Sequence, residues 1–295
     1  MTSQLAVVPL SGIGPAEDGS RDCRLVELWL SLKTSAHTRR AYAAEARRFL
    51  EFVAKPLLRV TLTDLLAWAV HLGQGSLQPN SRNRSLTAIK SLLGFAQDTG
   101  YLPFNVGAAV KLLPARDSLA QRILDESEVA RLIEAAREGR DRTLLKLLYA
   151  TGARVSEICG LKWDHAIARR EGGQLTLFGK GGKTRTVLLK PQIWDRLLLL
   201  RAGARPEDPI FPGRRPGMPL DVSQVRRIVY AAAARAGLRQ RISPHWMRHA
   251  HASHALDREA PIHLVQSTLG HASVSTTGRY LHARPTESSG FYLPD

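Results

Sequence analysis

The stretch "GGQLTLFGKGGKTRTVLLK", residues 172–190, differs in periodicity from the rest of the chain. Residues such as Leu175 and Leu177 alternate with polar ones on both sides of its centre, a pattern typical of β-strands. Between the two runs, Gly181 and Gly182 can supply the positive φ angles of a tight turn. We predict a β-hairpin here. Because it is the only clear strand signal, the fold is predicted to be mainly α with a small antiparallel sheet.

The N-terminal part has the apolar spacing of helices. Thr61 and Asp64 are spaced as a capping box, and Gly100 can end a helix in the left-handed conformation. We predict a small domain of four helices over residues 23–105. Residues 1–22 are predicted to be a flexible tail.

Residues 106–120 are predicted to be a linker, because they show no sustained period and contain Gly107 and Pro114. The second predicted domain covers residues 121–295 and is mostly helical around the hairpin. Within it, an apolar helix is broken at Gly152 and soon resumes.

The 295-residue chain is strongly basic, with 42 Lys and Arg against 26 Asp and Glu and a formal net charge of +16. Residues 1–117 hold 14 basic and 9 acidic side chains, and residues 118–295 hold 28 and 17. Both parts are therefore basic. Such an excess predicts a polyanionic partner, most often nucleic acid.

The composition also excludes several classes of protein. Cys23 and Cys159 lie far apart without CxxC spacing, so we expect neither a disulfide framework nor a cysteine zinc site. No run approaches the ~18 apolar residues of a membrane span, and the N-terminus lacks the basic region of a signal peptide. We expect a cytoplasmic protein without a membrane segment.

Basic side chains gather on the polar faces of the first domain's helices. Such a face is either merely solvated or in contact with phosphates, and the overall charge favours phosphates. The candidate DNA contacts of this domain are Arg39, Arg40, Arg82, Arg84 and Lys90.

Two basic features of the second domain stand near glycines. Arg154 in "TGARVSE" follows the helix break and either caps carbonyl groups or points at an anion. The hairpin tip holds Lys180, Lys183 and Arg185, but it lacks the G-x-x-x-x-G-K-[ST] pattern, so nucleotide binding is rejected. The tip can still reach DNA, and Lys183 and Arg185 are candidate DNA contacts.

The segment "SPHWMRHAHASH" is rich in histidine. His245 and Arg248 share one helix face, with His249 four residues after His245, so a metal site is conceivable. The Glu of H-E-x-x-H is missing. A His and an Arg that both point at one phosphate are the better interpretation, and no metal is predicted. Farther along, "LGHASVSTTGRYLHA" places His271 after Gly270 and Tyr280 nine residues later.

Taken in order, these segments resemble the tyrosine recombinases of the phage integrase family, and among them the Xer type. The blocks "ATGARVSEICGLKW", "GKGGKTR", "SPHWMRHAHASHAL" and "LGHASVSTTGRYLH" are similar to the family's signatures, in its order and near its spacing. The resemblance covers about residues 24–282. It implies an N-terminal core-binding domain of SAM-like fold and a C-terminal α+β catalytic domain with a trans-docking tail.

The resemblance also implies a role for each matching residue. Tyr280 is expected to be the nucleophile, Arg154 and Arg248 the phosphate clamps, and His245 and His271 the two histidine partners. His245 would accept the tyrosine proton or bond the phosphate. Lys180 matches the hairpin lysine, which would protonate the leaving 5′-oxygen. No cofactor and no metal are implied.

The expected activity is therefore site-specific recombination through a 3′-phosphotyrosyl link and a Holliday junction. The implied partners are duplex DNA with an inverted-repeat core site and further protomers in a homo- or hetero-tetramer on the nucleoid. The alternatives are a type IB topoisomerase and a non-catalytic DNA-binding regulator. The sequence leaves open whether strand exchange would serve chromosome segregation by dimer resolution, integration or transposition.

Overall fold

The computed structural model describes residues 18–75, 77–114, 119–215, 217–238 and 242–281. The chain divides into two compact units, Met1–Arg116 and Asp117–Asp295. Each unit has its own hydrophobic core. None of the described helices is long and apolar enough to cross a membrane.

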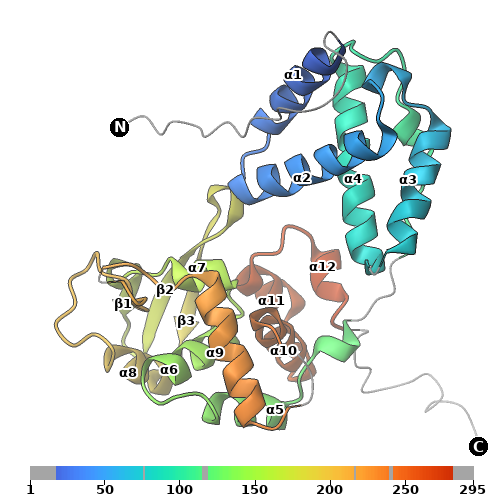
Figure 1. Ribbon diagram of the computed structural model, residues 1–295. Coiled ribbons are helices and arrows are strands. Elements are labelled where there is room, and N and C mark those ends of the chain that lie inside the picture. The colour runs from blue at the N-terminus through green and yellow to red at the C-terminus, as the bar shows by residue number, and fades with distance from the viewer. Residues whose placement is uncertain (1–17, 76, 115–118, 216, 239–241, 282–295) are drawn as a thin grey trace, which may run out of the picture. The chain divides into compact units, whose positions relative to one another are not determined.

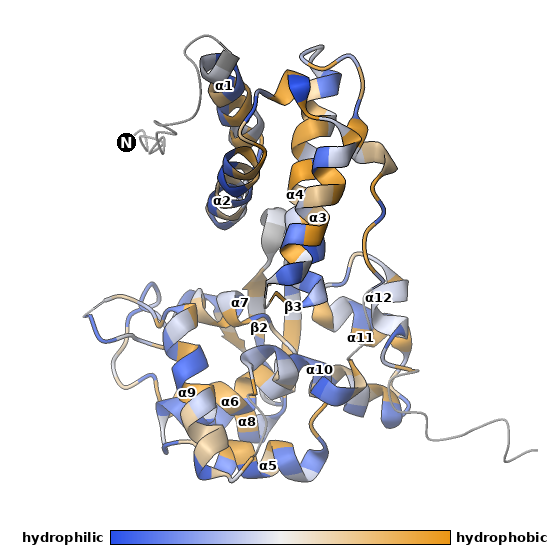
Figure 2. Cartoon of the chain, turned by 45° about the vertical axis from the view of Figure 1, so that its right-hand side comes forward, coloured by the Kyte–Doolittle hydropathy of each residue, from blue (hydrophilic) through white to orange (hydrophobic). Residues whose placement is uncertain are grey.

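The first unit is built of helices packed side by side (Figure 1). Thr61 and Asp64 form the expected capping box, which confirms the predicted start of its third helix. Figure 2 shows long hydrophobic stretches along the third and fourth helices, and these stretches bury the core. The elements are α1 (Asp18–Ser31), α2 (Ala36–Val53), the 3₁₀ helix η1 (Leu57–Arg59), α3 (Leu62–Gln74), α4 (Pro79–Asp98) and the 3₁₀ helix η2 (Val106–Ala109).

The boundaries of this unit differ from the prediction at both ends. Helix α1 begins at Asp18, so the tail predicted over residues 1–22 extends too far. Asp22 is buried and accepts hydrogen bonds from the backbone N–H of Leu57 at 2.8 Å and the hydroxyl of Tyr101 at 2.6 Å. A buried carboxylate must be satisfied in this way, and its two partners hold the start of α1 against the core.

The predicted linker, residues 106–120, also begins too early. Residues 106–109 form η2, which packs against α3 and α4, and Val110 belongs to the core of the first unit. Leu119 contributes to a small apolar cluster of the second unit. These apolar segments are too short to show a period. They are buried through tertiary contacts, which a search for periodicity does not detect.

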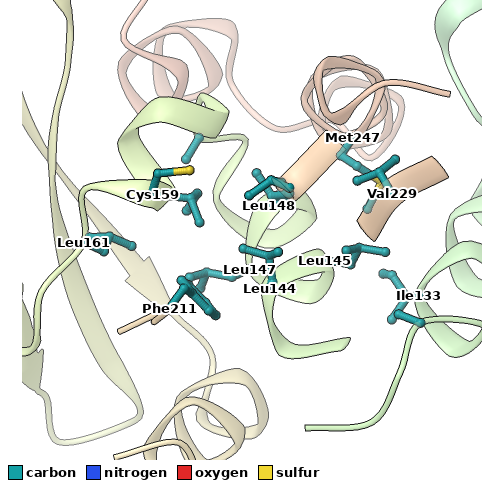
Figure 3. Close-up of a cluster of buried hydrophobic side chains, with 14 of the residues drawn as sticks. Ile133, Leu144, Leu145, Leu147, Leu148, Cys159, Leu161, Phe211, Val229 and Met247 are labelled. Atoms are coloured by element: carbon teal, nitrogen blue, oxygen red, sulfur yellow. The ribbon is translucent and has the colours of Figure 1, made fainter. Parts of the chain in front are cut away.

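The second unit surrounds helix α6 (Arg140–Thr151), which contacts helices on several sides as well as the sheet. Four of its leucines, residues 144, 145, 147 and 148, have no exposed surface (Figure 3). A helix face as broadly apolar as this one must be covered by other elements. Each fully buried leucine contributes on the order of 1.5–3 kcal/mol.

The other elements of this unit follow the order of the chain (Figure 1). They are η3 (Ala120–Arg122), α5 (Glu126–Glu134), α7 (Val155–Cys159), η4 (Trp163–His165), β1 (Ala166–Ala168), β2 (Gly173–Phe178), η5 (Lys180–Gly182), β3 (Thr184–Leu189), α8 (Pro191–Leu198), α9 (Val222–Arg235), α10 (Pro244–Asp257), α11 (Ile262–Leu269) and α12 (Val274–Gly278).

Within the described residues, one antiparallel sheet forms with the strand order β1-β2-β3. The hairpin prediction is confirmed: β2 pairs with β3 from Gly173↔Leu189 to Phe178↔Thr184, and Gly181 and Gly182 have φ of 75° and 74°. Strand β1 was not predicted. It has three residues, too few to show an alternating pattern. The mainly α fold with a small antiparallel sheet is confirmed.

Candidate active site

Arg154 is placed by the break between α6 and α7. Gly152 ends α6 with φ 56° and ψ 20°, a left-handed conformation that favours glycine. Arg154 follows as the N-cap of α7, where its backbone N–H donates to Glu157 at 2.7 Å and its guanidinium donates to the same carboxylate at 2.9 Å. The side chain is 36% exposed and can reach a ligand.

Glu157 is the buried centre of an ion-pair network. Its side chain is 2% exposed, and two nitrogens of Arg185 donate to it at 2.9 and 2.8 Å. Burial raises the pKa of Glu157, but the hydrogen bonds from Arg185 and Arg154 outweigh that effect and hold its pKa below the ordinary value. Glu157 is therefore ionised at neutral pH. The sequence pattern did not single it out, although its i+3 spacing from Arg154 is a local signal.

Arg185 was predicted to contact DNA, and in the described structure its guanidinium makes its hydrogen bonds within the protein. Its side chain is 12% exposed, and its Nε donates to the carbonyl oxygen of Thr268 at 2.6 Å. Arg185 thus joins β3 to Glu157 on α7 and to the end of α11. The physical reason is that a buried carboxylate needs a cation, and the hairpin register brings Arg185 to it.

Arg248 lies at the bottom of the site. It is 2% exposed, and its two terminal nitrogens donate to the carbonyl oxygens of Gly152 at 2.6 Å and Leu269 at 2.7 Å. Burial and the nearby cations Arg154 and Arg185 lower the pKa of Arg248 to about 10, so it stays charged at neutral pH. Arg248 connects α10 with the ends of α6 and α11 and adds a fixed positive charge near Arg154.

His245 and His271 both lie in the field of these arginines. Desolvation and the charges of Arg248 and Arg154 lower the pKa of His245 below its ordinary value and that of His271 to about 4. Both imidazoles are therefore neutral at neutral pH. His245 is exposed, whereas Nδ1 of His271 is 2.9 Å from the hydroxyl of Thr277.

Tyr280 is 5% exposed and packs in an apolar cluster with residues such as Ile123 and Leu269. It lies just beyond a helix: α12 ends at Gly278, and the backbone N–H of Tyr280 donates to the carbonyl oxygen of Thr277 at 3.0 Å. Burial raises the pKa of its phenol above the ordinary value, against the lowering effect of Arg248 and Arg279. The phenol is neutral in this state.

His249 touches the phenol, a contact that sequence analysis did not foresee. Its Nδ1 is 2.8 Å from the Tyr280 hydroxyl, and its ring lies 4.8 Å from that of His245. The sequence raised His249 only as a possible metal ligand. Among the described residues, no group of three or more His, Cys, Asp and Glu side chains that could hold a metal ion is found. The four-residue spacing from His245 was the available signal.

The hairpin tip contains the two remaining candidates. Lys180 begins η5, and its side chain lies outside the described part of the chain. Lys183, at the other end of the turn, is exposed.

The basic residues singled out in the first unit divide into two groups. Arg40 is exposed and Arg39 partly exposed, and both are open to a partner. The other three have intramolecular contacts: Arg84 lies 3.5 Å from the buried Glu45, Nε of Arg82 donates to Leu77 at 2.9 Å, and Nζ of Lys90 donates to Val110. The amine of Lys90 thereby holds the end of η2.

The arrangement suits an oxyanion. The charges of Arg154 and Arg185 lower the pKa of Arg248. Glu157 neutralises only one of these three charges, and the nearby histidines are neutral. The remaining positive charge lies on Arg154, which is partly exposed, and on Arg248, whose charge acts on the Tyr280 phenol. Fixed guanidiniums recognise phosphate oxygens and stabilise charge that develops on them.

Family models match both units. Residues 122–287 match the phage integrase family, and residues 25–100 match its N-terminal SAM-like domain. The tyrosine recombinase XerC of Mycobacterium tuberculosis (strain ATCC 25177 / H37Ra) is 33% identical over 280 residues, covering 86% of this chain and 91% of the relative. XerC of Xanthomonas campestris pv. campestris (strain B100) is 29% identical, with 93% and 88% covered.

Solved structures show the same fold. A lambda integrase fragment in a dimer bound to a COC′ core site has a TM-score of 0.74 at 20% identity, with 90% of this chain and 95% of that chain covered. XerH bound to a palindromic difH substrate has a TM-score of 0.72 at 21% identity, with 93% and 88% covered. On the family matches and the identity with XerC, this chain belongs to the phage integrase family, as a Xer-type tyrosine recombinase.

Proposed function

We propose that this site-specific recombinase cuts and rejoins duplex DNA at Tyr280. The observation that supports this most is the gathering of Arg154, Arg248, His245 and His271 beside the phenol, with more positive charge than Glu157 neutralises. A phosphodiester anion would supply the missing negative charge. Its repulsion of an incoming phenolate would fall as the guanidiniums bind its oxygens.

In the proposed reaction, Oη of Tyr280 attacks the scissile phosphorus. A bond forms between Oη and phosphorus, and the bond from phosphorus to the 5′-oxygen breaks. The phenolic proton passes to His245, and Lys180 protonates the leaving 5′-oxygen. The product is a 3′-phosphotyrosyl link with a free 5′-hydroxyl. Because the link conserves the energy of the broken bond, a 5′-hydroxyl of another strand can reverse the step.

The other residues of the site would hold the phosphate. Arg154 and Arg248 bind its non-bridging oxygens, and His271 keeps it in line with Tyr280. Arg39, Arg40 and Lys183 are proposed to contact the DNA backbone, since Arg40 and Lys183 are exposed and Arg39 is partly exposed. The all-helical unit thus serves as a core-binding domain and the second unit as the catalytic domain.

The assembly is proposed by analogy. Another lambda integrase structure holds a tetramer bound to a Holliday junction, with a TM-score of 0.73 to this chain. We infer a tetramer on an inverted-repeat core site, at the nucleoid in the cytoplasm. The segment expected to dock on a neighbouring protomer, Leu281–Asp295, lies almost wholly outside the described residues. A type IB topoisomerase or a non-catalytic regulator is not favoured, because the relatives are named recombinases.

The first test replaces the proposed nucleophile. Wild type and Tyr280→Phe are incubated with fragments of the source genome that carry nicks, and the DNA that stays attached to protein in detergent is sequenced. We expect adducts from wild type alone, concentrated at one inverted repeat. Tyr280→Phe should bind DNA with unchanged affinity, because the hydroxyl is buried and makes its hydrogen bond to His249.

The other outcomes would contradict either the proposed nucleophile or the proposed activity. Adducts formed by Tyr280→Phe would show that another residue is the nucleophile. Wild-type adducts scattered over the genome would favour a topoisomerase, and their absence would favour a binding protein.

A further inference from the structure

We propose that His249 is a positioning residue for the nucleophile: its Nδ1 accepts the hydrogen bond of the Tyr280 phenol and thereby sets the direction from which Oη attacks. This inference rests on the proposed role of Tyr280. It adds to the expected site a residue that neither clamps the phosphate nor protonates the leaving group.

The first support is that a buried phenol needs a partner. Tyr280 is 5% exposed, and its apolar neighbours hold the ring without fixing the direction of the hydroxyl. His249 is the partner of the hydroxyl in the described structure, at 2.8 Å. Rotation of the O–H about its bond is restricted by this contact, so a lone pair of Oη stays directed away from His249.

The second support is that the neighbouring histidines are arranged for other tasks. His271 stacks on Tyr280 with an interplanar angle of 4° and a centroid distance of 6.4 Å, and its Nδ1 faces Thr277. His245 is exposed near Arg154 and Arg248. One imidazole therefore lies along the face of the phenol ring, another lies towards the phosphate position, and His249 faces the hydroxyl.

The third support is that His249 is held firmly and is neutral. It follows Arg248, whose two carbonyl contacts hold this turn of α10. Desolvation, with His245 and Arg122 as further causes, lowers the pKa of His249 to about 4. A neutral imidazole has one accepting nitrogen, and we assign that role to Nδ1 with the proton on Nε2. An imidazole with so low a pKa is a weak base, which favours positioning over proton abstraction.

The test measures adduct formation in a single turnover, as a function of DNA concentration, on a duplex nicked near the scissile phosphate. The variants are His249→Ala, His249→Gln and His249→Asn. The Asn oxygen can occupy the position of Nδ1, whereas the Gln amide reaches the position of Nε2 and misses it. His263→Asn is the control, because His263 is exposed on α11.

We expect the maximal rate to fall by about 10²-fold in the Ala and Gln variants, which is the order of loss for a misplaced reacting group. The Asn variant should recover at least about a tenth of the wild-type rate, and the DNA concentration at half-maximal rate should not change in any variant. If the Ala variant does not fold, the contrast between Asn and Gln decides. Wild-type rates in the Ala variant, faster cleavage, or equal rates of Asn and Gln would overturn the proposal.

A second substrate distinguishes a defect in attack by Tyr280 from a defect in protonation of the leaving group. Sulfur in place of the bridging 5′-oxygen leaves without a proton, so it bypasses the leaving-group acid. The defect of His249→Ala should persist on this substrate, and full recovery would overturn the proposal. An inactive wild type, or an active Tyr280→Phe, would contradict the proposed function instead, so the two failures can be told apart.

Discussion

The residue that organises the site is Glu157, which touches no predicted substrate atom. It holds Arg154 from its own helix and Arg185 from the hairpin, and it is almost fully buried. A buried pair of charges is costly to form but more costly to break, because a single remaining charge is left without water or partner. The position of Arg154 therefore depends on a carboxylate beneath it.

We expect Glu157→Gln to lower the free energy of unfolding of the second unit by about 3–5 kcal/mol, because it leaves two arginines without their counter-charge. Urea unfolding followed by hydrogen exchange in α6 measures this loss. Glu207→Gln is the matched control: Glu207 is 58% exposed opposite Arg205, and such surface pairs contribute about 0–1 kcal/mol. Equal losses in the two variants would show that Glu157 does not stabilise the arginines.

At the scale of elements, the junction of α6 and α7 connects the core to the site. Helix α6 ends at Thr151, and Gly152 turns the chain so that its carbonyl accepts from Arg248 and Arg154 starts α7. A Cβ at position 152 would lie 2.6 Å from Leu269 and 2.7 Å from His251. The turn therefore needs glycine for its φ and for the space around it.

We expect Gly152→Ala to destabilise the second unit by more than Gly237→Ala. Gly237 also has a positive φ, 65°, but a Cβ there meets nothing within 4 Å. In both variants backbone strain should lower the free energy of unfolding by about 1 kcal/mol. Crowding around position 152 should lower it by about 1–3 kcal/mol more in Gly152→Ala. Gly152→Ala should also slow adduct formation, since its strain displaces Arg154. Equal unfolding midpoints in urea would show that the junction relaxes without cost.

At the scale of the whole molecule, a net charge of +16 spreads over both units, and the site keeps its histidines neutral among arginines. Acid protonates these histidines more readily in the unfolded chain, where the pKa is ordinary, than in the folded one. The stability that they contribute is complete above about pH 6.5 and is lost as the pH falls towards about 4.

We therefore expect the urea midpoint of the second unit to fall between pH 7.5 and pH 5. DNA that binds the site should reduce this fall, because phosphate favours the protonated imidazoles. His249→Asn should show a weaker dependence on pH than wild type, with His263→Asn as the unchanged reference. A midpoint that does not respond to pH would contradict the assignment of buried neutral histidines.

The sequence by itself determined what depends on local spacing. The capping box at Thr61, the break at Gly152 and the hairpin all follow from neighbouring residues, and each is confirmed. The order of the recombinase blocks could also be recognised in the sequence, and the family matches confirm the assignment to the phage integrase family.

Only the tertiary structure decided which side chains meet. Arg185 reaches Glu157 across 28 residues and Thr268 across 83, and His249 meets Tyr280 across 31. In the sequence, Arg185 has the appearance of a surface cation and His249 that of a metal ligand. Their partners depend on burial, because a group removed from water must find the charge or hydrogen bond that packing brings to it. Packing joins residues that no local period relates.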